Sequence, residues 1–147
     1  MTGPHITVRE TVLVRRPPSE VWDYTQDFAN RTTWDLGVRA VDVLDDAPRR
    51  VRVDLQGTGS ATLEYQLDRR PERTSLRMVD VVSRWIAGGG GSWEYSPVPG
   101  GTAWTQTNTL VLRHRRLGRL LAPLVERSLR ANTRTAMRRA KGILEAR

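Results

Sequence analysis

The feature that most limits the possible folds is a long succession of strand patterns over residues 38–113. Turn signals rich in glycine, proline and aspartate divide this region, and six strands fit between them. Connections this short favour antiparallel hairpins, because a parallel crossover needs a dozen or more residues. We therefore expect an antiparallel meander. Its turn signals lie at residues 45–48, 57–59, 70–72, 88–91 and 99–101.

One strand and two short helices are expected before the meander. Residues 6–14 alternate polar and apolar side chains, as a half-buried strand does. Pro17 and Pro18 end that strand, and Pro18 suits the first position of a helix over residues 18–26. Phe28 continues the helical spacing, so a second helical turn is expected over residues 30–34.

The chain is expected to end in a long helix over residues 117–146, with Pro123 starting or kinking its main part. One face is basic and should be exposed and nearly dispensable for folding. It carries Arg127, Arg130, Arg134, Arg138 and Lys141. The opposite face should cover the sheet, and it carries Val125, Leu129, Asn132, Ala136, Ala140 and Ile143. Because Asn132, Ala136 and Ala140 are small or polar, we expect a cavity beneath the helix.

The composition is that of one globular domain, which we expect to span residues 1–147. Hydrophobic residues make up 38% and charged residues 27%, so neither disorder nor a membrane protein is indicated. The chain has no cysteine, which excludes disulfides and thiolate metal sites. Residues 1–10 lack the apolar stretch of a signal peptide, and the expected location is the cytoplasm.

The formal net charge of +8 comes from the C-terminal part of the chain, because residues 113–147 carry 11 basic and 2 acidic side chains, whereas residues 1–112 carry 13 basic and 14 acidic ones. Nucleic-acid binding is not expected, since this segment has no Phe, Trp or Tyr to stack on bases. A weak contact with anionic membrane is an alternative. It would use Leu117, Leu120, Leu121 and Leu124 beside Arg115, Arg116 and Arg119.

Four local patterns resemble the START-like superfamily, also known as SRPBCC, in its polyketide cyclase/dehydrase-like branch. They lie at residues 17–23, 27–34, 93–102 and 117–124. The resemblance implies an α+β helix-grip fold, in which a curved seven-stranded antiparallel sheet wraps around a long C-terminal helix. It also implies a hydrophobic or amphipathic small molecule bound between sheet and helix, without a cofactor.

The last strand carries the main candidate ligand-binding residues. Trp104, Gln106 and Asn108 share one face with Leu110 and Leu112, and that face is assigned inward. The two amides either pair with each other or with buried water, or they bind a polar group of a ligand. Trp93 on the neighbouring strand, Tyr65, and the helix residues Asn132 and Ala136 complete the expected cavity wall on this side.

The strand over residues 76–82 has two plausible orientations. In the one adopted here, Leu76, Met78 and Asp80 face the cavity, whereas Arg77, Val79 and Val81 would face it in the other. A buried, unpaired Asp80 would have a raised pKa and could transfer a proton. The alternative is an exposed Asp80, or one paired with Arg84.

Other candidate sites are weak. Glu20, Asp23 and Asp27 share a helix face, but a solvated face is the better interpretation than a metal site, and no metal is expected. His5 and His114 offer no evident catalytic geometry. The glycine clusters at residues 57–59 and 88–91 precede strands and are interpreted as turns or bulges.

The primary functional hypothesis is a carrier or sensor that binds one small molecule without changing it. The ligand should be neutral or weakly polar unless Asp80 or an arginine turns inward. The alternatives are a polyketide cyclase/dehydratase that uses Asp80, Asn108, Gln106 or Tyr65, and a membrane-surface or partner-binding module. Sequence patterns leave the ligand and the oligomeric state open.

Overall fold

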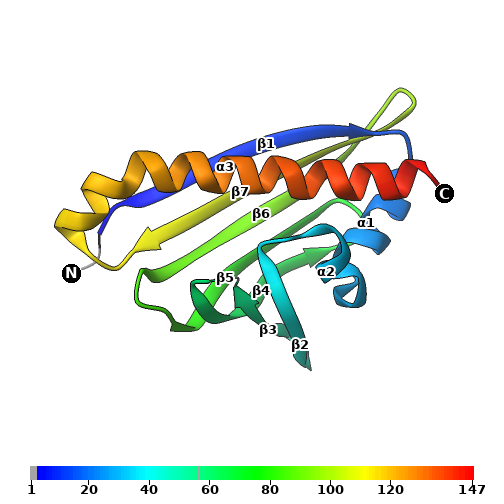
Figure 1. The fold of residues 1–147 in the computed structure, drawn as a ribbon. Coiled ribbons are helices and arrows are strands. Elements are labelled where there is room, and N and C mark those ends of the chain that lie inside the picture. The colour runs from blue at the N-terminus through cyan, green and yellow to red at the C-terminus, as the bar shows by residue number, and fades with distance from the viewer. Residues whose placement is uncertain (1–2, 56) are drawn as a thin grey trace.

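The computed structural model describes residues 3–55 and 57–147. A strand and three short helical segments come first, followed by a six-strand meander and one long helix (Figure 1). The elements are β1 (His5–Val14), α1 (Pro18–Gln26), η1 (Phe28–Asn30), α2 (Arg31–Trp34), β2 (Val38–Asp46), β3 (Arg49–Leu55), β4 (Gly59–Arg69), β5 (Arg73–Val82), β6 (Ile86–Val98), β7 (Gly101–Leu112) and α3 (Arg115–Glu145).

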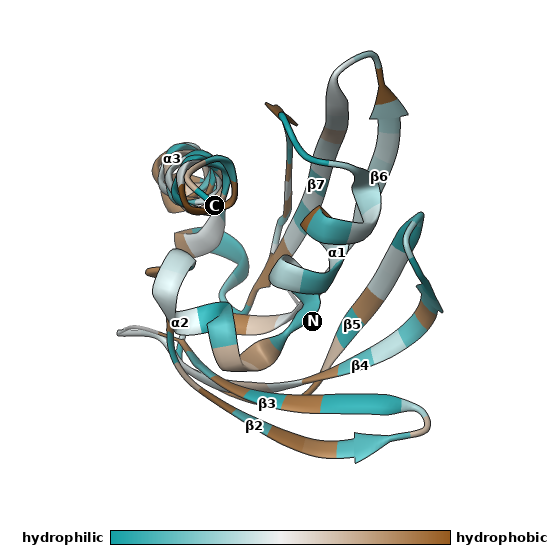
Figure 2. Ribbon diagram, turned by 90° about the vertical axis from the view of Figure 1, so that its right-hand side faces the viewer, coloured by the Kyte–Doolittle hydropathy of each residue, from teal (hydrophilic) through white to brown (hydrophobic). Residues whose placement is uncertain are grey.

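The strands form one seven-stranded sheet in the order β1-β7-β6-β5-β4-β3-β2, and every neighbouring pair is antiparallel. Figure 2 shows the sheet curving from β7 and β6 to β3 and β2, with α3 on the concave side. The predicted helix-grip fold is therefore confirmed.

The helix boundaries follow local signals closely. Pro18 lies in the first turn of α1, where its missing N–H costs no hydrogen bond, and Glu20 adds a favourable charge there. α3 begins at Arg115, before the predicted start, and Pro123 lies inside it. No helix in the described ranges is long and apolar enough to cross a bilayer.

Two clusters of buried side chains form the core, one toward the β1–β7–β6 end of the curved sheet and one toward the β2–β3–β4 end. The first joins α1, α2, β6 and β7 to the C-terminal half of α3 through residues such as Trp34, Trp104 and Met137. The second joins β2, β3 and β4 through Val51, Val53 and neighbouring residues. The space between the two clusters is where a cavity can form.

The buried face of α3 differs from the predicted one. Ala136 and Ala140 are buried as expected, but Thr133, Met137 and Leu144 are buried as well, and Asn132 is exposed. The reason is that α3 packs mainly on β1, at one margin of the sheet. Its buried face is therefore rotated toward β1, and the predicted face borders the cavity.

The basic stripe of α3 is only partly a free surface. Arg127 and Arg138 are exposed as predicted. Arg130 Nη1 and Arg134 Nε, however, lie 3.1 and 3.0 Å from Glu10 Oε1 on β1. Lys141 donates to the backbone carbonyl of Leu13 and pairs with Glu145. The stripe therefore helps to hold α3 on β1, which corrects the expectation that all of it faces solvent, while its near-dispensability for folding stays a prediction.

Glu10 should make the stability of the fold depend on pH. Burial opposes ionisation of Glu10, but hydrogen bonds and charge from Arg134 and Arg130 outweigh it and lower the pKa of this carboxyl. Because the folded-state pKa is lower than the unfolded-state pKa of about 4.3, ionised Glu10 stabilises the fold at pH values above about 4.3. This stabilisation is lost as the pH falls through the folded-state pKa.

We therefore expect Glu10→Gln to lower the free energy of unfolding by on the order of 1 kcal/mol at pH 7. The difference from the parent should be smaller at pH 3 than at pH 7, because the stabilisation is lost as the pH falls through the lowered folded-state pKa, as measured by urea denaturation. Glu72→Gln, at an exposed position, is the matched control and should change little at either pH. A difference for Glu10→Gln that is the same at both pH values would contradict the ion-pair explanation.

Candidate functional site: an amphipathic cavity beneath the long helix

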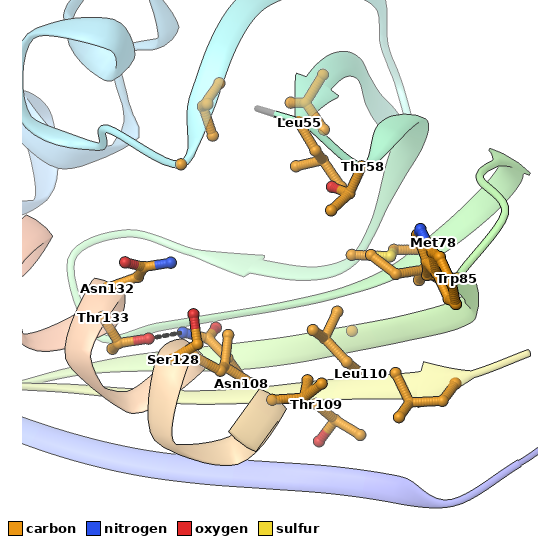
Figure 3. A pocket seen from close by; sticks show the side chains of 18 of the residues that line it. Leu55, Thr58, Met78, Trp85, Asn108, Thr109, Leu110, Ser128, Asn132 and Thr133 are labelled. Atoms are coloured by element: carbon orange, nitrogen blue, oxygen red, sulfur yellow. Dashed lines mark hydrogen bonds between the residues drawn. The ribbon is translucent and has the colours of Figure 1, made fainter. Parts of the chain in front are cut away.

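A cavity of about 440 Å³ lies between α3 and the concave face of the sheet. Its walls come from β2 to β7, the segment around α2, and α3 (Figure 3). The volume lies in the range of about 300 to 1,000 Å³ that is typical of small-molecule sites. Of the predicted ligand-binding residues, the structure places Trp93, Gln106, Asn108, Met78, Asn132 and Ala136 in its wall.

One half of the cavity is apolar. β7 contributes Leu110 and Leu112, which share the inward face predicted for that strand. The first turns of α3 contribute Leu117 and Leu121, and Ile86 and Met78 come from β6 and β5. This half therefore favours the apolar part of a ligand and has few hydrogen-bonding groups for a polar one.

β6 forms part of the cavity wall, and a glycine in it keeps that wall close to β5. Gly90 lines the cavity, and a Cβ at this position would lie 2.6 Å from the carbonyl oxygen of Leu76, so a larger residue does not fit without a shift. The β5–β6 ladder runs only from Arg73 to Arg77 on β5, so the strands diverge beyond Arg77 and Gly90. The glycine cluster at residues 88–91 lies inside β6 with a register shift at its start, as the bulge interpretation predicted.

The other half carries two amides. Asn108 Nδ2 donates to Gln106 Oε1 at 3.0 Å and to Thr133 Oγ1 at 3.4 Å, and Trp93 Nε1 donates to Asn108 Oδ1 at 3.4 Å. The two amides thus bond to each other, which was one of the two alternatives. Gln106 is 3% exposed, and its Nε2 is buried with no hydrogen-bond partner in the described part of the chain. A buried N–H without a partner is costly, and because this atom has almost no accessible surface, a ligand oxygen reaches it only if the Gln106 side chain shifts toward the cavity.

An ion pair lies at the same polar end. Arg31 and Asp35 both line the cavity, and Arg31 Nε and Nη2 each lie 2.9 Å from Asp35 Oδ2. The guanidinium is also packed against Trp34 and Trp93, with 4.8 and 4.7 Å between its carbon and the two ring centroids. An arginine therefore does turn inward, but Asp35 neutralises its charge.

Exposed lining residues mark where the cavity reaches the surface. Trp85 and Leu117 are 46% and 42% exposed, and His114 is exposed beside them. The Trp85 and His114 rings lie edge to face, 5.9 Å apart. We call the region of Trp85, Leu117 and His114 the mouth of the cavity, and it lies at the apolar end. Ser128 and Asn132 of α3 also line the cavity and are exposed, so the cavity is open along the helix as well.

Trp104 was predicted to line the cavity, and the structure corrects this. Its side chain faces inward from β7 but is completely buried. It packs against Trp34, Trp93 and Tyr95, with ring centroids 5.6 to 6.1 Å away. Trp104 is not part of the cavity wall, so its role is in the core.

Tyr65 also lies outside the cavity wall. Its hydroxyl donates to Gln26 Oε1 at 3.3 Å, and its ring lies under the Arg49 guanidinium, 3.9 Å from the centroid. Gln26 in turn donates to the Tyr95 hydroxyl at 2.8 Å. Burial raises the pKa of Tyr65, so this group stays protonated at neutral pH within a structural network.

Asp80 is exposed and does not line the cavity, although Leu76 and Met78 do. Asp80 has a φ of 48°, in the left-handed region that aspartate tolerates better than most residues. The β4–β5 register shifts there, so Asp80 and Val81 stand opposite the single residue Ala61. This bulge ends the alternation, and the predicted inward orientation of Asp80 is wrong.

The acidic face of α1 is occupied by ordinary contacts. Asp23 forms a two-bond pair with Arg70, with both distances 2.8 Å, and Asp27 accepts from the backbone N–H of Ala29. Arg16 lies 3.9 Å from Glu20. These contacts are those of a solvated, ion-paired surface.

Among the lining residues that the sequence analysis did not identify are three at the polar end, Arg31, Asp35 and Thr133. Arg31 and Asp35 are four residues apart, the spacing of a helical ion pair, but the short helix gave no reason to place them in a cavity. Thr133 is one position from the predicted Asn132, and rotation of α3 toward β1 brought it beside Asn108. A test for i, i+4 charge pairs near tryptophans would have found the first two.

Comparison with solved structures supports the same architecture. The Zhui aromatase/cyclase from Streptomyces sp. R1128 superposes with a TM-score of 0.80 at 18% identity, covering 97% of this chain and 94% of that one. A START superfamily protein from Mycobacterium smegmatis gives 0.77 at 14% identity, covering 97% and 99%. At such identities the likeness shows the fold alone. No curated protein sequence matches this chain significantly.

A family model provides the sequence evidence. The model described as polyketide cyclase / dehydrase and lipid transport matches residues 5–145, which is nearly the whole chain. The match agrees with the helix-grip fold and with a cavity under the long helix. On this evidence the chain belongs to the polyketide cyclase/dehydrase and lipid transport family.

Proposed function

We propose that this protein, as one domain in the cytoplasm, binds a single neutral amphipathic molecule in the cavity and carries or senses it without changing it. The observation that supports this most directly is the division of the cavity into an apolar half and a polar end. Leucines line the half toward the mouth, whereas Gln106, Asn108 and Arg31 lie at the other end. Such a site matches a molecule with one polar group and an apolar body.

The polar end also suggests how the molecule is oriented. Gln106 Nε2 has no acceptor among the described residues, so a shift of this side chain toward a carbonyl or hydroxyl oxygen of the ligand would remove the cost of an unsatisfied donor. The apolar body would then point along Leu110 and Leu112 toward the mouth. Because Asp35 already neutralises Arg31, an anionic group gains little at this end.

The cyclase/dehydratase alternative is weaker. Asp80 and Tyr65, two of its four candidate residues, lie outside the cavity wall, and the amides of Gln106 and Asn108 can polarise a carbonyl but have no useful pKa for proton transfer. Zhui is an aromatase/cyclase by name, but its likeness to this chain is a likeness of fold alone. Turnover of a polyketide analogue by this protein would favour the alternative over the carrier.

Filling the apolar half should strongly weaken ligand binding. Leu110 points into the cavity in Figure 3, so Leu110→Trp places a larger ring in the space of the ligand. We expect the affinity for the neutral probe N-phenyl-1-naphthylamine to fall by at least about tenfold, as measured by fluorescence titration. The melting temperature should hold, since the ring enters empty space.

Leu44→Trp is the matched control, because Leu44 is 52% exposed on β2 and does not line the cavity. Its affinity for the probe should equal that of the parent. Equal affinity in Leu110→Trp and Leu44→Trp would show that the probe binds elsewhere and would remove the support for the proposed function.

A further inference from the structure

We infer that the mouth of the cavity is a docking surface for anionic membranes. The surface combines exposed apolar side chains with a group of arginines on two neighbouring segments, the β5–β6 connection and the first turns of α3. Its apolar members are Trp85, Leu117, Leu120 and Leu124, and its basic members are Arg84, Arg115, Arg116 and Arg119.

The exposed leucines form one stripe with residues that line the cavity. Leu120 and Leu124 are 75% and 64% exposed, and they lie three and seven positions after Leu117 on α3. Leu117 and Leu121 line the cavity. This spacing puts all four on one side of the helix, so the stripe runs from the cavity wall out to the protein surface.

Trp85 is held beside this stripe by backbone contacts. The N–H of Arg113 donates to the carbonyl of Trp85 at 2.8 Å, and the Arg113 side chain donates to the carbonyls of Ser83 and Ile86 at 3.1 Å each. His114 Nε2 lies 3.1 Å from the carbonyl of Arg84. Figure 1 shows the β5–β6 connection and the start of α3 at the same end of the molecule.

The charge of this region identifies the kind of partner. Residues 81–93 and 111–125 contain five arginines and no aspartate or glutamate. Exposed leucine and tryptophan beside arginine match the boundary between lipid headgroups and acyl chains, where tryptophan is enriched and each basic residue attracts anionic lipid. A second copy of the chain fits less well, because a twofold contact would place this arginine group against itself.

Docking in this orientation would turn the apolar end of the cavity toward the lipid. A bound molecule would then leave or enter with its apolar body nearest the membrane, which is consistent with the proposed function. The surface itself is argued from residues outside the polar end of the cavity. Vesicle binding and probe binding can therefore fail independently.

The test is sedimentation of the full chain with vesicles of phosphatidylcholine, with and without phosphatidylserine. We expect binding to the vesicles that contain phosphatidylserine, weakened by salt. Leu120→Ser/Leu124→Ser should weaken it by at least tenfold. Arg116→Gln/Arg119→Gln should weaken it roughly tenfold to thirtyfold, because each arginine near the surface contributes about a fivefold factor.

Matched controls remove the same groups elsewhere. Leu13→Ser/Leu44→Ser removes two leucines that are 60% and 52% exposed, and Arg9→Gln/Arg39→Gln removes two exposed arginines from β1 and β2. Both should bind vesicles like the parent, and unchanged melting temperatures should show that all four variants fold.

Absence of binding by the parent, or equal losses in variants and controls, would overturn the inference. So would a dimer in sedimentation velocity that Leu120→Ser/Leu124→Ser abolishes without any vesicle binding.

Discussion

Trp104→Ala should lower the free energy of unfolding by about 3 to 5 kcal/mol, the usual cost of removing a large buried aromatic side chain. Trp104 is completely buried and contacts Trp34, Trp93 and Tyr95. Removing its ring leaves a void that these neighbours cannot fill, because they are held by α2 and β6. Since domains of this size have about 5 to 15 kcal/mol of stability in total, the variant should be close to unfolding.

Urea denaturation followed by circular dichroism measures this effect. Trp85→Ala is the matched control, because Trp85 is 46% exposed, and it should change the free energy of unfolding by less than about 1 kcal/mol. Trp104→Phe keeps most of the ring contacts and should fold and bind the neutral probe. A Trp104→Ala variant of unchanged stability that fails to bind the probe would instead make Trp104 part of the cavity wall.

The order of elements was predictable because each boundary has a local cause. Pro17 and Pro18 end β1 and start α1. Four of the five turn signals lie where strands of the meander end, whereas the signal at residues 88–91 lies inside β6 and the β5–β6 connection comes earlier, at residues 83–85. The alternation of Gln106 and Asn108 with leucines placed them on the inner face of β7, since strand alternation is a property of the backbone alone.

The errors arose where contacts distant in sequence decide the outcome. Asp80 lies in a bulge set by the pairing of β5 with β4, so an unbroken alternation put it on the wrong side. The buried face of α3 depends on its packing against β1, which determines whether Thr133 and Met137 are covered. Trp104 faces inward as predicted, but it is completely buried among core rings, and of the three rings that it contacts Trp93 is the one that lines the cavity.

The ion pair at the polar end leads to the second large effect, a change in which ligands bind. In the parent, Asp35 Oδ2 accepts from two nitrogens of Arg31, so the guanidinium is neutralised before a ligand arrives. Asp35→Asn removes that negative charge. Its side-chain oxygen can still accept from the N–H of Gly37, which now bonds to Asp35 Oδ1 at 3.2 Å.

We therefore expect Asp35→Asn to change the ratio of decanoate to decanol affinity in favour of decanoate by about 10-fold to 100-fold. The reason is that a hydrogen bond to a charged group contributes about 1.5 to 3 kcal/mol once the competing carboxylate is gone. Displacement of N-phenyl-1-naphthylamine measures both affinities. Decanoate should also restore thermal stability lost through the unpaired Arg31, because a ligand that binds the folded state stabilises it.

Arg31→Met/Asp35→Asn is the control and should again prefer decanol. If the parent already prefers decanoate as strongly as Asp35→Asn does, Asp35 does not neutralise the cavity, and the neutral ligand we propose would be the wrong class.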